Sequence, residues 1–286
     1  MQCFVGFCLY FFSGGPVIAE ESLTPIELLT SPLPIFSVQQ DNGHMSGYSV
    51  EYARSIFELA GYNPTVTPLP FARLIKHMDK SDIVVATGIA RTSEREDDFF
   101  WIAPMTANVI GIFSIVDYSV HGGTMSDEHQ QNTTAEGFDT LNTVGVLRGD
   151  YRGDILRDHG VKNVVEYNSW EQAVAAVLKG RVSSVFFSEL GIALICKSAG
   201  FDCASLKQIY TYDIQFSYMA MLKTDQNREH AIKLTTAAER LISTLRFEQL
   251  LKEWLPQLEL MGTKVNVTEG VITFGKIENS ESFANK

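Results

Sequence analysis

The chain has 286 residues, which at about 100–200 residues per domain predicts two domains. Apolar residues make up 45% and charged residues 20%, a composition typical of folded globular proteins, which excludes a wholly disordered chain. Lys and Arg number 23 against 34 Asp and Glu, a formal net charge of −11. Because proteins that bind nucleic acid or anionic membranes carry a basic face, neither is an expected partner.

The N-terminal segment has the features of a secretory signal peptide. Residues 1–19 carry no charged side chain, and the apolar stretch from Cys3 to Phe12 is shorter than the roughly 20 residues that span a bilayer. Small residues end the segment at Ala19, before Glu20. We therefore expect cleavage after Ala19 and export of the remaining chain. The segment lacks the basic residue that usually begins a signal peptide, and a buried N-terminal strand is the alternative reading.

Apolar periodicity predicts alternating strands and helices in the first half. Expected strands cover residues 26–29, 64–69, 82–87 and 109–116, and expected helices cover residues 50–60 and 71–78. A polar, Gly-rich stretch at residues 121–134 then predicts a loop or a domain edge.

The alternation restarts near residue 140. Strands are expected at residues 143–147, 163–166, 183–187 and 214–222, and helices near Asp154 and at residues 170–178, 190–198, 231–245 and 247–255. Pro256 is expected to end the last helix. Residues 264–274 alternate around Glu269-Gly270 and predict a hairpin.

Strand–helix alternation predicts an α/β fold with largely parallel sheets, and the restart predicts two such units. Ligands bind such sheets beyond the carboxyl ends of the strands. This directs attention to the loops at residues 87–95, 147–152 and 187–189.

Two cysteines remain after removal of the signal segment. Cys196 and Cys203 flank six residues, with Gly200 suited to a left-handed helix end. An even pair in an oxidising compartment predicts a structural disulfide, and two buried free thiols are the alternative.

Five short motifs occur in order along the chain. They are G-Y-S-V-E-Y-A at residues 47–53, T-S-E-R at 92–95, W-I-A-P at 101–104, V-G-V-L-R-G at 144–149 and G-R-V-S-S-V at 180–185. In that order they resemble G-F-D-V-D-L-A, T-x-E-R, F-S-x-P, V-G-V-x-x-G and G-R-V-D-A-V of the bacterial extracellular solute-binding proteins, family 3, the polar amino acid type of ABC uptake systems. The resemblance covers about residues 26–255.

The resemblance implies a two-lobed periplasmic binding protein of type II, with a ligand cleft between two α/β lobes that close by hinge motion. By analogy, the chain crosses between lobes near residues 109–116 and 215–222. Lobe 1 is then expected at residues 20–112 and 219–262, lobe 2 at residues 113–218, and a C-terminal extension at residues 263–286.

The resemblance also implies which residues contact the solute. Arg95 matches the arginine that pairs with the ligand carboxylate, for which a planar guanidinium offers a bidentate fork. Thr87 and Gly88 match family positions that contact the solute, and Phe71 matches an aromatic position. Arg73 lies on the same predicted helix as Phe71, where it adds a positive charge or forms part of a solvated face.

In lobe 2, Gly149 precedes a helix whose free N–H groups suit an anion. Tyr151 takes a position where the family often has a Ser or Thr that contacts the carboxylate, and Arg148 and Arg152 flank it. Together with Arg73, Arg91 and Arg95, these arginines predict a locally positive pocket.

The chain departs from the family where an acid holds the α-ammonium of the ligand. That position is Ser188, followed by Glu189. An uncompensated buried ammonium is costly, so if Glu189 does not turn inward the solute is expected to lack an amine. Glu189 as an ordinary first-turn residue of a helix is the alternative.

The expected function is therefore a non-catalytic, monomeric periplasmic protein that delivers a small polar, carboxylate-bearing solute to an inner-membrane ABC permease. Two alternatives use the same fold: a sensor subunit that presents its closed form to a membrane receptor, and a cyclohexadienyl dehydratase-like enzyme with Glu189 as general acid. The six histidines are scattered, and neither a metal nor another cofactor is expected.

Overall fold

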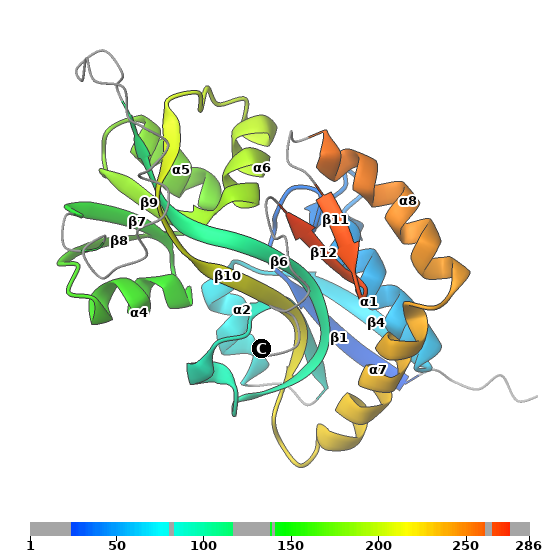
Figure 1. Ribbon diagram of the computed structural model, residues 1–286. Coiled ribbons are helices and arrows are strands. Elements are labelled where there is room, and N and C mark those ends of the chain that lie inside the picture. The colour runs from blue at the N-terminus through cyan, green and yellow to red at the C-terminus, as the bar shows by residue number, and fades with distance from the viewer. Residues whose placement is uncertain (1–23, 80–82, 117–137, 139–140, 261–264, 275–286) are drawn as a thin grey trace, which may run out of the picture.

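The computed structural model describes residues 24–79, 83–116, 138, 141–260 and 265–274 (Figure 1). The predicted signal peptide and the predicted loop at residues 121–134 lie outside these ranges. Among the described residues, no helix combines the length and the apolar character needed to cross a membrane.

The first half of the chain forms the alternating elements that its periodicity predicts. They are β1 (Thr24–Thr30), the short strands β2 (Val38–Gln39) and β3 (Met45–Ser46), α1 (Tyr48–Leu59), β4 (Tyr62–Pro68), α2 (Phe71–Met78) and β5 (Val84–Ala90). In α1 the apolar residues at helical spacing, including Val50, Ala53 and Ile56, are fully buried. Strands β4 and β5 pair in parallel with β1.

Two strands run the length of the molecule and are longer than predicted. β6 (Phe99–Ile115) and β10 (Leu206–Leu222) pair antiparallel from end to end. The N-terminal part of β6 escapes prediction because it contains Pro104, which lacks a ladder donor. The strand accommodates this proline at a register shift, where Thr106 pairs with Ser217 and Pro104 with Tyr218.

The second half repeats the alternation. Its elements are β7 (Thr143–Leu147), α4 (Tyr151–Asp158), β8 (Asn163–Tyr167), α5 (Trp170–Leu178), β9 (Ser184–Ser188) and α6 (Glu189–Ala199). β8 and β9 pair in parallel with β7, and β9 pairs antiparallel with β6. In Figure 1, α5 and α6 lie above these strands and α4 lies below.

Ten of the described strands form one sheet in the order β4-β1-β5-β10-β6-β9-β7-β8, with the C-terminal hairpin attached at β6, and β2 and β3 form a separate two-stranded sheet. The two long strands thus join a lobe built on β4, β1 and β5 to a lobe built on β9, β7 and β8, as Figure 1 shows. This is the predicted two-lobed α/β fold. The expected lobe boundaries at residues 112/113 and 218/219 fall inside β6 and β10.

The chain returns to the first lobe through α7 (Arg228–Leu241) and α8 (Leu245–Glu259). The prediction that Pro256 ends the last helix is wrong, because α8 continues through it. Proline removes one backbone donor, but the next turn still closes through the Leu260 amide, which donates to the Pro256 carbonyl at 3.1 Å. Trp254 and Leu258 are buried on the inner face, which holds the helix in place.

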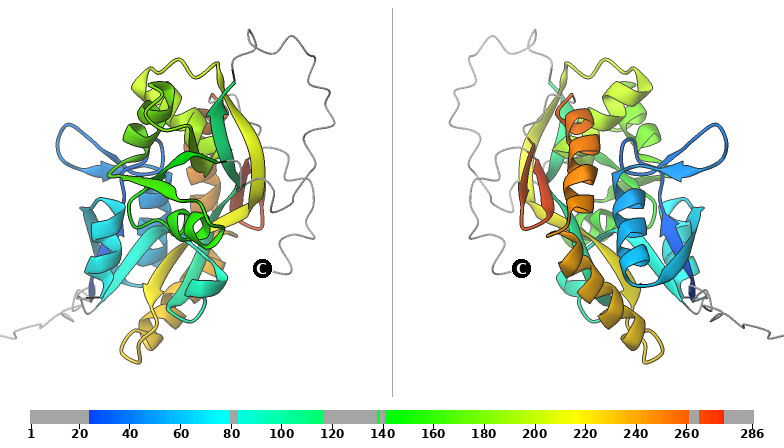
Figure 2. Two further views of the ribbon diagram at one scale, coloured as in Figure 1. Left: turned by 90° about the vertical axis from the view of Figure 1, so that its left-hand side faces the viewer. Right: turned by 90° about the vertical axis from the view of Figure 1, so that its right-hand side faces the viewer.

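The predicted C-terminal hairpin is present as β11 (Val265–Thr268) and β12 (Val271–Phe274). Glu269 and Gly270 both have positive φ, as a two-residue type I′ turn requires. β12 pairs in parallel with β6, placing Ile272 opposite Thr106, and Figure 2 shows the hairpin against the long strands. All four β12 residues are buried, so the hairpin is part of the core of the first lobe.

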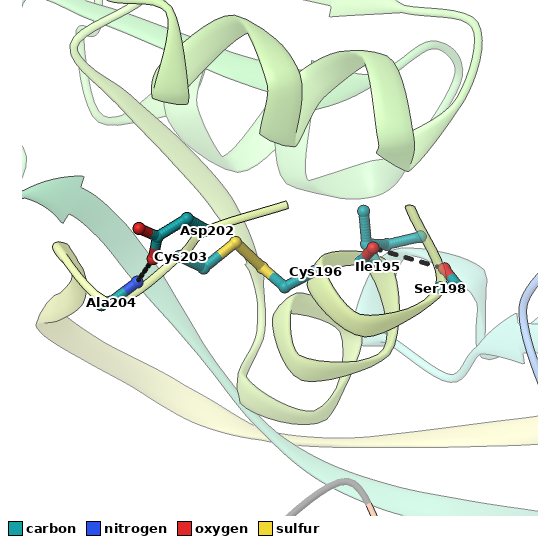
Figure 3. Close-up of a disulfide and its surroundings, with 6 residues drawn as sticks. All are labelled: Ile195, Cys196, Ser198, Asp202, Cys203 and Ala204. Carbon is teal, nitrogen blue, oxygen red and sulfur yellow. Dashed lines mark hydrogen bonds between the residues drawn. A yellow bond between two sulfur atoms is a disulfide. The ribbon is translucent and has the colours of Figure 1, made fainter. Parts of the chain in front are cut away.

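The predicted disulfide joins Cys196 of α6 to Cys203 with a Cα–Cα distance of 6.1 Å (Figure 3). Gly200 ends α6 in the left-handed conformation with φ of 66°. The bridge therefore closes the turn between α6 and β10.

Candidate functional site

A cavity of about 160 Å³ lies where the two lobes meet. Both lobes and the two long strands contribute to its lining. From the first lobe come residues such as Thr30, Leu33, Phe36, Phe71, Thr87 and Gly88; from the second, residues such as Asp150, Arg152, Trp170, Phe187, Ser188 and Leu190. β6 supplies Thr106 and Asn108, and β10 supplies Gln215 and Ser217.

The lobes touch beside this cavity. A Cβ added to Gly149, just before α4, would lie 3.2 Å from both the Cα and the Cβ of Ala72 in α2. Leu147 of β7 is buried in the same apolar cluster as Phe71, and Trp170 packs against that cluster. The second lobe is thus seated on α2, which is the arrangement of a closed cleft.

Hydroxyl groups line the first-lobe side of the cavity in a connected chain. The Thr87 Oγ1 hydroxyl donates to Thr30 Oγ1 at 3.2 Å, which donates to Ser37 Oγ at 2.8 Å. This order leaves the Ser37 proton to donate to another acceptor. Thr30 and Thr87 lie close together because β1 and β5 are adjacent parallel strands, whose carboxyl ends meet at one edge of the sheet.

The strands that join the lobes carry a second polar group. Asn108 Nδ2 donates to Thr106 Oγ1 at 3.1 Å, and Thr106 Oγ1 lies 2.7 Å from Ser217 Oγ. Asn108 Oδ1 is buried and has no hydrogen-bond partner among the described residues. A buried acceptor without a partner favours a donor or water from the cavity.

A buried ion pair stands at the start of α4. The Arg152 side chain is 10% exposed and Asp150 is 8% exposed, and Arg152 Nη1 donates to Asp150 Oδ1 at 2.8 Å and to Oδ2 at 2.9 Å. Burial alone would lower the pKa of Arg152, but the Asp150 charge and hydrogen bonds outweigh it and raise that pKa. The guanidinium therefore stays charged inside the site.

Aromatic rings surround this guanidinium. Its Cζ lies 4.7 Å from the centroid of Tyr151, 5.4 Å from Trp170 and 5.9 Å from Phe187. Trp170 and Phe187 stack on each other at 3.7 Å with an interplanar angle of 13°. Two of these rings, Trp170 and Phe187, therefore line the second-lobe side of the cavity beside one fixed cation.

Four of the predicted contact residues line the cavity, namely Thr87, Gly88, Phe71 and Ser188. Ser188 also caps α6, because its Oγ accepts from the Gly191 amide at 3.0 Å. The other six predicted residues lie outside its lining: Arg73, Arg95, Arg148, Gly149, Tyr151 and Glu189.

The positions of those six residues have local causes. Arg95 ends the 3-10 turn η1 (Ser93–Arg95), half-buried, with its Cζ 5.7 Å from the Tyr151 ring and its buried Nη1 without a hydrogen bond among the described residues. Arg73 is exposed on α2, and Arg148 is exposed and donates to Asn168 at 2.9 Å.

Tyr151 is buried under its neighbours, and this burial raises the pKa of its phenol. It lines a different groove, of about 410 Å³, that runs along β10. Glu189 is exposed as the first residue of α6.

The expected cluster of five arginines is therefore not assembled around the cavity. Of Arg73, Arg91, Arg95, Arg148 and Arg152, Arg152 alone lines it. The side chains extend in different directions from loops that lie close together, and most find local acids. Arg91, for example, pairs with Glu96.

Sequence reasoning missed the aromatic wall and the amide on β6. Trp170 is expected only as part of a helix, and Phe187 lies in the predicted cleft loop at residues 187–189 but is not among the expected contact residues. The available signal is positional, because Trp170 follows the helix cap Ser169 and Phe187 is the residue before the end of β9. Both positions lie at the carboxyl edge of the second-lobe sheet, where ligands bind.

No group of three or more His, Cys, Asp or Glu in the described part of the chain could hold a metal ion.

Comparisons with known proteins agree with this geometry. Residues 28–257 match the family described as bacterial extracellular solute-binding proteins, family 3. No match to the sequence was found among curated proteins.

Solved structures share the fold at low sequence identity. One is a histidine kinase sensor domain with similarity to periplasmic binding proteins (TM-score 0.67, 18% identity, covering 82% of this chain and 97% of that one). Another is a mutant of ArgBP from T. maritima (TM-score 0.64, 18% identity, 81% and 95% covered). A third is an ABC uptake transporter substrate binding protein from Streptococcus pneumoniae with bound histidine (TM-score 0.63, 14% identity, 81% and 92% covered). Likeness at such identity shows the fold alone, whereas the family match covers most of the chain. The protein therefore belongs to the bacterial extracellular solute-binding proteins, family 3.

Proposed function

We propose that this protein is a periplasmic, monomeric solute-binding protein that captures a small polar, carboxylate-bearing solute by closing its two lobes and delivers it to an inner-membrane ABC permease. The observation that carries the proposal is the cavity between the lobes. It is lined from both lobes, and Gly149 of one lobe lies against Ala72 of the other beside it. A solute in this position would be enclosed by closure and released by opening.

The long strands supply the hinge in this proposal. β6 and β10 are the strands that join the two lobes in the described sheet, and their pairing is interrupted by register shifts, including one at Ser217. Such irregular positions can change their backbone angles with little loss of pairing. We place the lobe boundaries there, at residues 112/113 and 218/219, as the sequence predicts.

A sensory role is the second candidate. The specific observation in its favour is the likeness to a histidine kinase sensor domain over 82% of this chain. Transport and sensing use the same cleft, so the partner that recognises the closed form distinguishes them. Pull-down with the closed, solute-loaded protein would recover permease subunits for uptake and a receptor kinase for sensing.

The test is a thermal-shift screen of the purified protein against amino acids, dicarboxylates, aromatic acids and amines. A solute at 100 times its Kd stabilises the folded state by about 2.7 kcal/mol, which raises Tm by several degrees. Small-angle scattering with and without each hit measures closure. If no small solute raises Tm or compacts the protein, the binding function is wrong.

Export is tested separately. Expression of the full chain in a Gram-negative host should yield periplasmic protein whose measured mass is that of residues 20–286. A measured mass equal to that of residues 1–286 would show that the segment before Glu20 is not cleaved.

A further inference from the structure

One buried donor in the cavity lacks an acceptor. Arg152 Nε is buried and has no hydrogen-bond partner among the described residues, although Nη1 of the same guanidinium is bound by Asp150. A buried charged donor without an acceptor is unfavourable, and native sites supply a partner from ligand or water. Arg152 lines the cavity, so an oxygen acceptor of a bound solute that reaches Nε would satisfy this donor.

The position of this guanidinium is restricted. Asp150 holds one edge through two hydrogen bonds, and the rings of Tyr151, Trp170 and Phe187 lie within 5.9 Å of its Cζ. The stacked Trp170 and Phe187 line the cavity from the same lobe, and Phe71 lines it from the first lobe. A solute with a planar body fits between such surfaces.

The lining offers no acid that is free for an ammonium group. Of the described residues around the cavity, Asp150 and Arg152 alone carry a formal charge. Both carboxylate oxygens of Asp150 accept from Arg152, and Ser188, which stands where the family's acid is expected, caps α6. An α-ammonium could donate to Asn108 Oδ1, the unpartnered acceptor on β6, but that acceptor is uncharged, so the ammonium would lose its water without gaining a counter-charge.

The cavity also limits size. Its volume of about 160 Å³ is close to that of an apolar cavity of about 150 Å³ that admits benzene. One ring with a short acid arm fits this volume.

We propose, building on the function proposed above, that the solute is a flat, amine-free monocarboxylate of about one ring in size. Its carboxylate binds Arg152 of the second lobe rather than Arg95. Arg152 supplies the positive charge and the unpartnered Nε donor. The Ser37 hydroxyl, which is the last in the hydrogen-bonded series of hydroxyl groups, supplies a donor from the opposite lobe. Closure therefore completes the carboxylate site, which couples binding to lobe movement.

The experiment uses isothermal titration calorimetry on the purified full chain with phenylacetate, 2-phenylglycine and phenylacetamide as probes. 2-Phenylglycine differs from phenylacetate only by the α-ammonium, and phenylacetamide replaces one carboxylate oxygen by an NH2 group, which removes the charge and one acceptor. We expect phenylacetate to bind best, and each of the other two to bind at least about tenfold more weakly, which corresponds to about 1.4 kcal/mol. This comparison needs no variant and is independent of folding effects.

Variants then locate the anchor. Arg152→Gln should weaken phenylacetate binding at least about tenfold. Arg157→Gln on the same helix, whose exposed side chain pairs with Asp154 and Glu166, is the matched control and should bind as the wild type does. If Arg152→Gln unfolds because Asp150 is left buried without its partner, the double variant Asp150→Asn/Arg152→Gln replaces the pair by two amides and should show the same loss.

Three results would overturn this inference. Equal or tighter binding of 2-phenylglycine would show that the site accepts an ammonium. Loss of binding in Arg95→Gln but not in Arg152→Gln would place the anchor at Arg95. Absence of binding by all three probes would exclude the solute class. In each case a positive hit for another solute in the thermal-shift screen would leave the proposed function standing, and a screen without hits would remove both.

Discussion

A matched pair of glycine substitutions tests whether closure seats the second lobe on α2. Gly149 and Gly160 flank α4 with φ of 74° and 78°, a left-handed conformation that costs alanine about 1–2 kcal/mol. Their surroundings differ. A Cβ at Gly149 would lie 3.2 Å from the Cα and the Cβ of Ala72, whereas a Cβ at Gly160 would have no heavy atom within 4 Å.

The magnitude follows from this overlap. Carbon atoms in contact prefer about 3.5–4.0 Å, so Gly149→Ala intrudes by a few tenths of an ångström on a backbone atom that cannot rotate away. Overpacking typically costs about 1–3 kcal/mol, and here it falls on the closed state alone, because opening separates Gly149 from Ala72. We expect the solute Kd to rise about fivefold or more in Gly149→Ala and to stay unchanged in Gly160→Ala.

The assay combines calorimetry with the solute found by the screen and thermal unfolding of the ligand-free proteins. Both variants should lower the ligand-free Tm similarly, because both carry the same backbone strain. An equal change of Kd in the two variants, or none in Gly149→Ala, would refute the contact between Gly149 and Ala72 in the solute-bound state.

Three further predictions concern stability. Phe274→Ala should lower the free energy of unfolding in urea by about 3–5 kcal/mol, because the ring is buried edge-on against Phe36; a change below about 1 kcal/mol would contradict a core role for the hairpin. Reduction of the Cys196–Cys203 disulfide should lower Tm by several degrees, since a short loop contributes about 2 kcal/mol; equal Tm with and without reductant would argue against it. Burial raises the pKa of Tyr52 from 10.0 to about 12, so the folded state keeps a proton that the unfolded chain releases. Stability should therefore fall as pH rises from about 10 to 12, and urea unfolding across this range should show a smaller fall in Tyr52→Phe.

The C-terminal hairpin connects the end of the chain to the ligand site. Phe274 contacts Phe36, which lines the cavity, and Ile272 pairs with Thr106, which also lines it. The family match ends at residue 257, so these contacts come from a segment beyond it. The hairpin thus packs against two residues that line the cavity, and this packing buries the four residues of β12.

Local patterns were sufficient for most of the fold. α2, β7 and α5 have the predicted bounds, because helical or alternating apolar spacing is a property of adjacent residues. The hairpin turn was predicted at Glu269-Gly270, where the glycine readily adopts positive φ, and the disulfide was predicted from an even pair of cysteines in an exported chain. The prediction that Pro256 ends a helix is wrong, and the part of β6 that contains Pro104 is covered by no predicted strand. In both cases packing of the surrounding element outweighs one lost donor.

The candidate site could be predicted only in part. The motifs located the cleft loops, and Thr87, Gly88, Phe71 and Ser188 of those predicted do line the cavity. The direction of a long side chain, however, depends on what the opposite lobe places beside it. Arg95 lies beside Tyr151, and Arg152 turns inward because Asp150 holds it.

The sequence by itself determined the order of elements, the family and the loops that face the cleft, because these depend on spacing along the chain. Tertiary structure decided which cation lies in the cavity, that Trp170 stacks on Phe187, and that the hairpin joins β6. These features join residues far apart in the chain, through contacts that exist only once both lobes have folded and met. No local pattern records such contacts, because burial and orientation are properties of the assembled core.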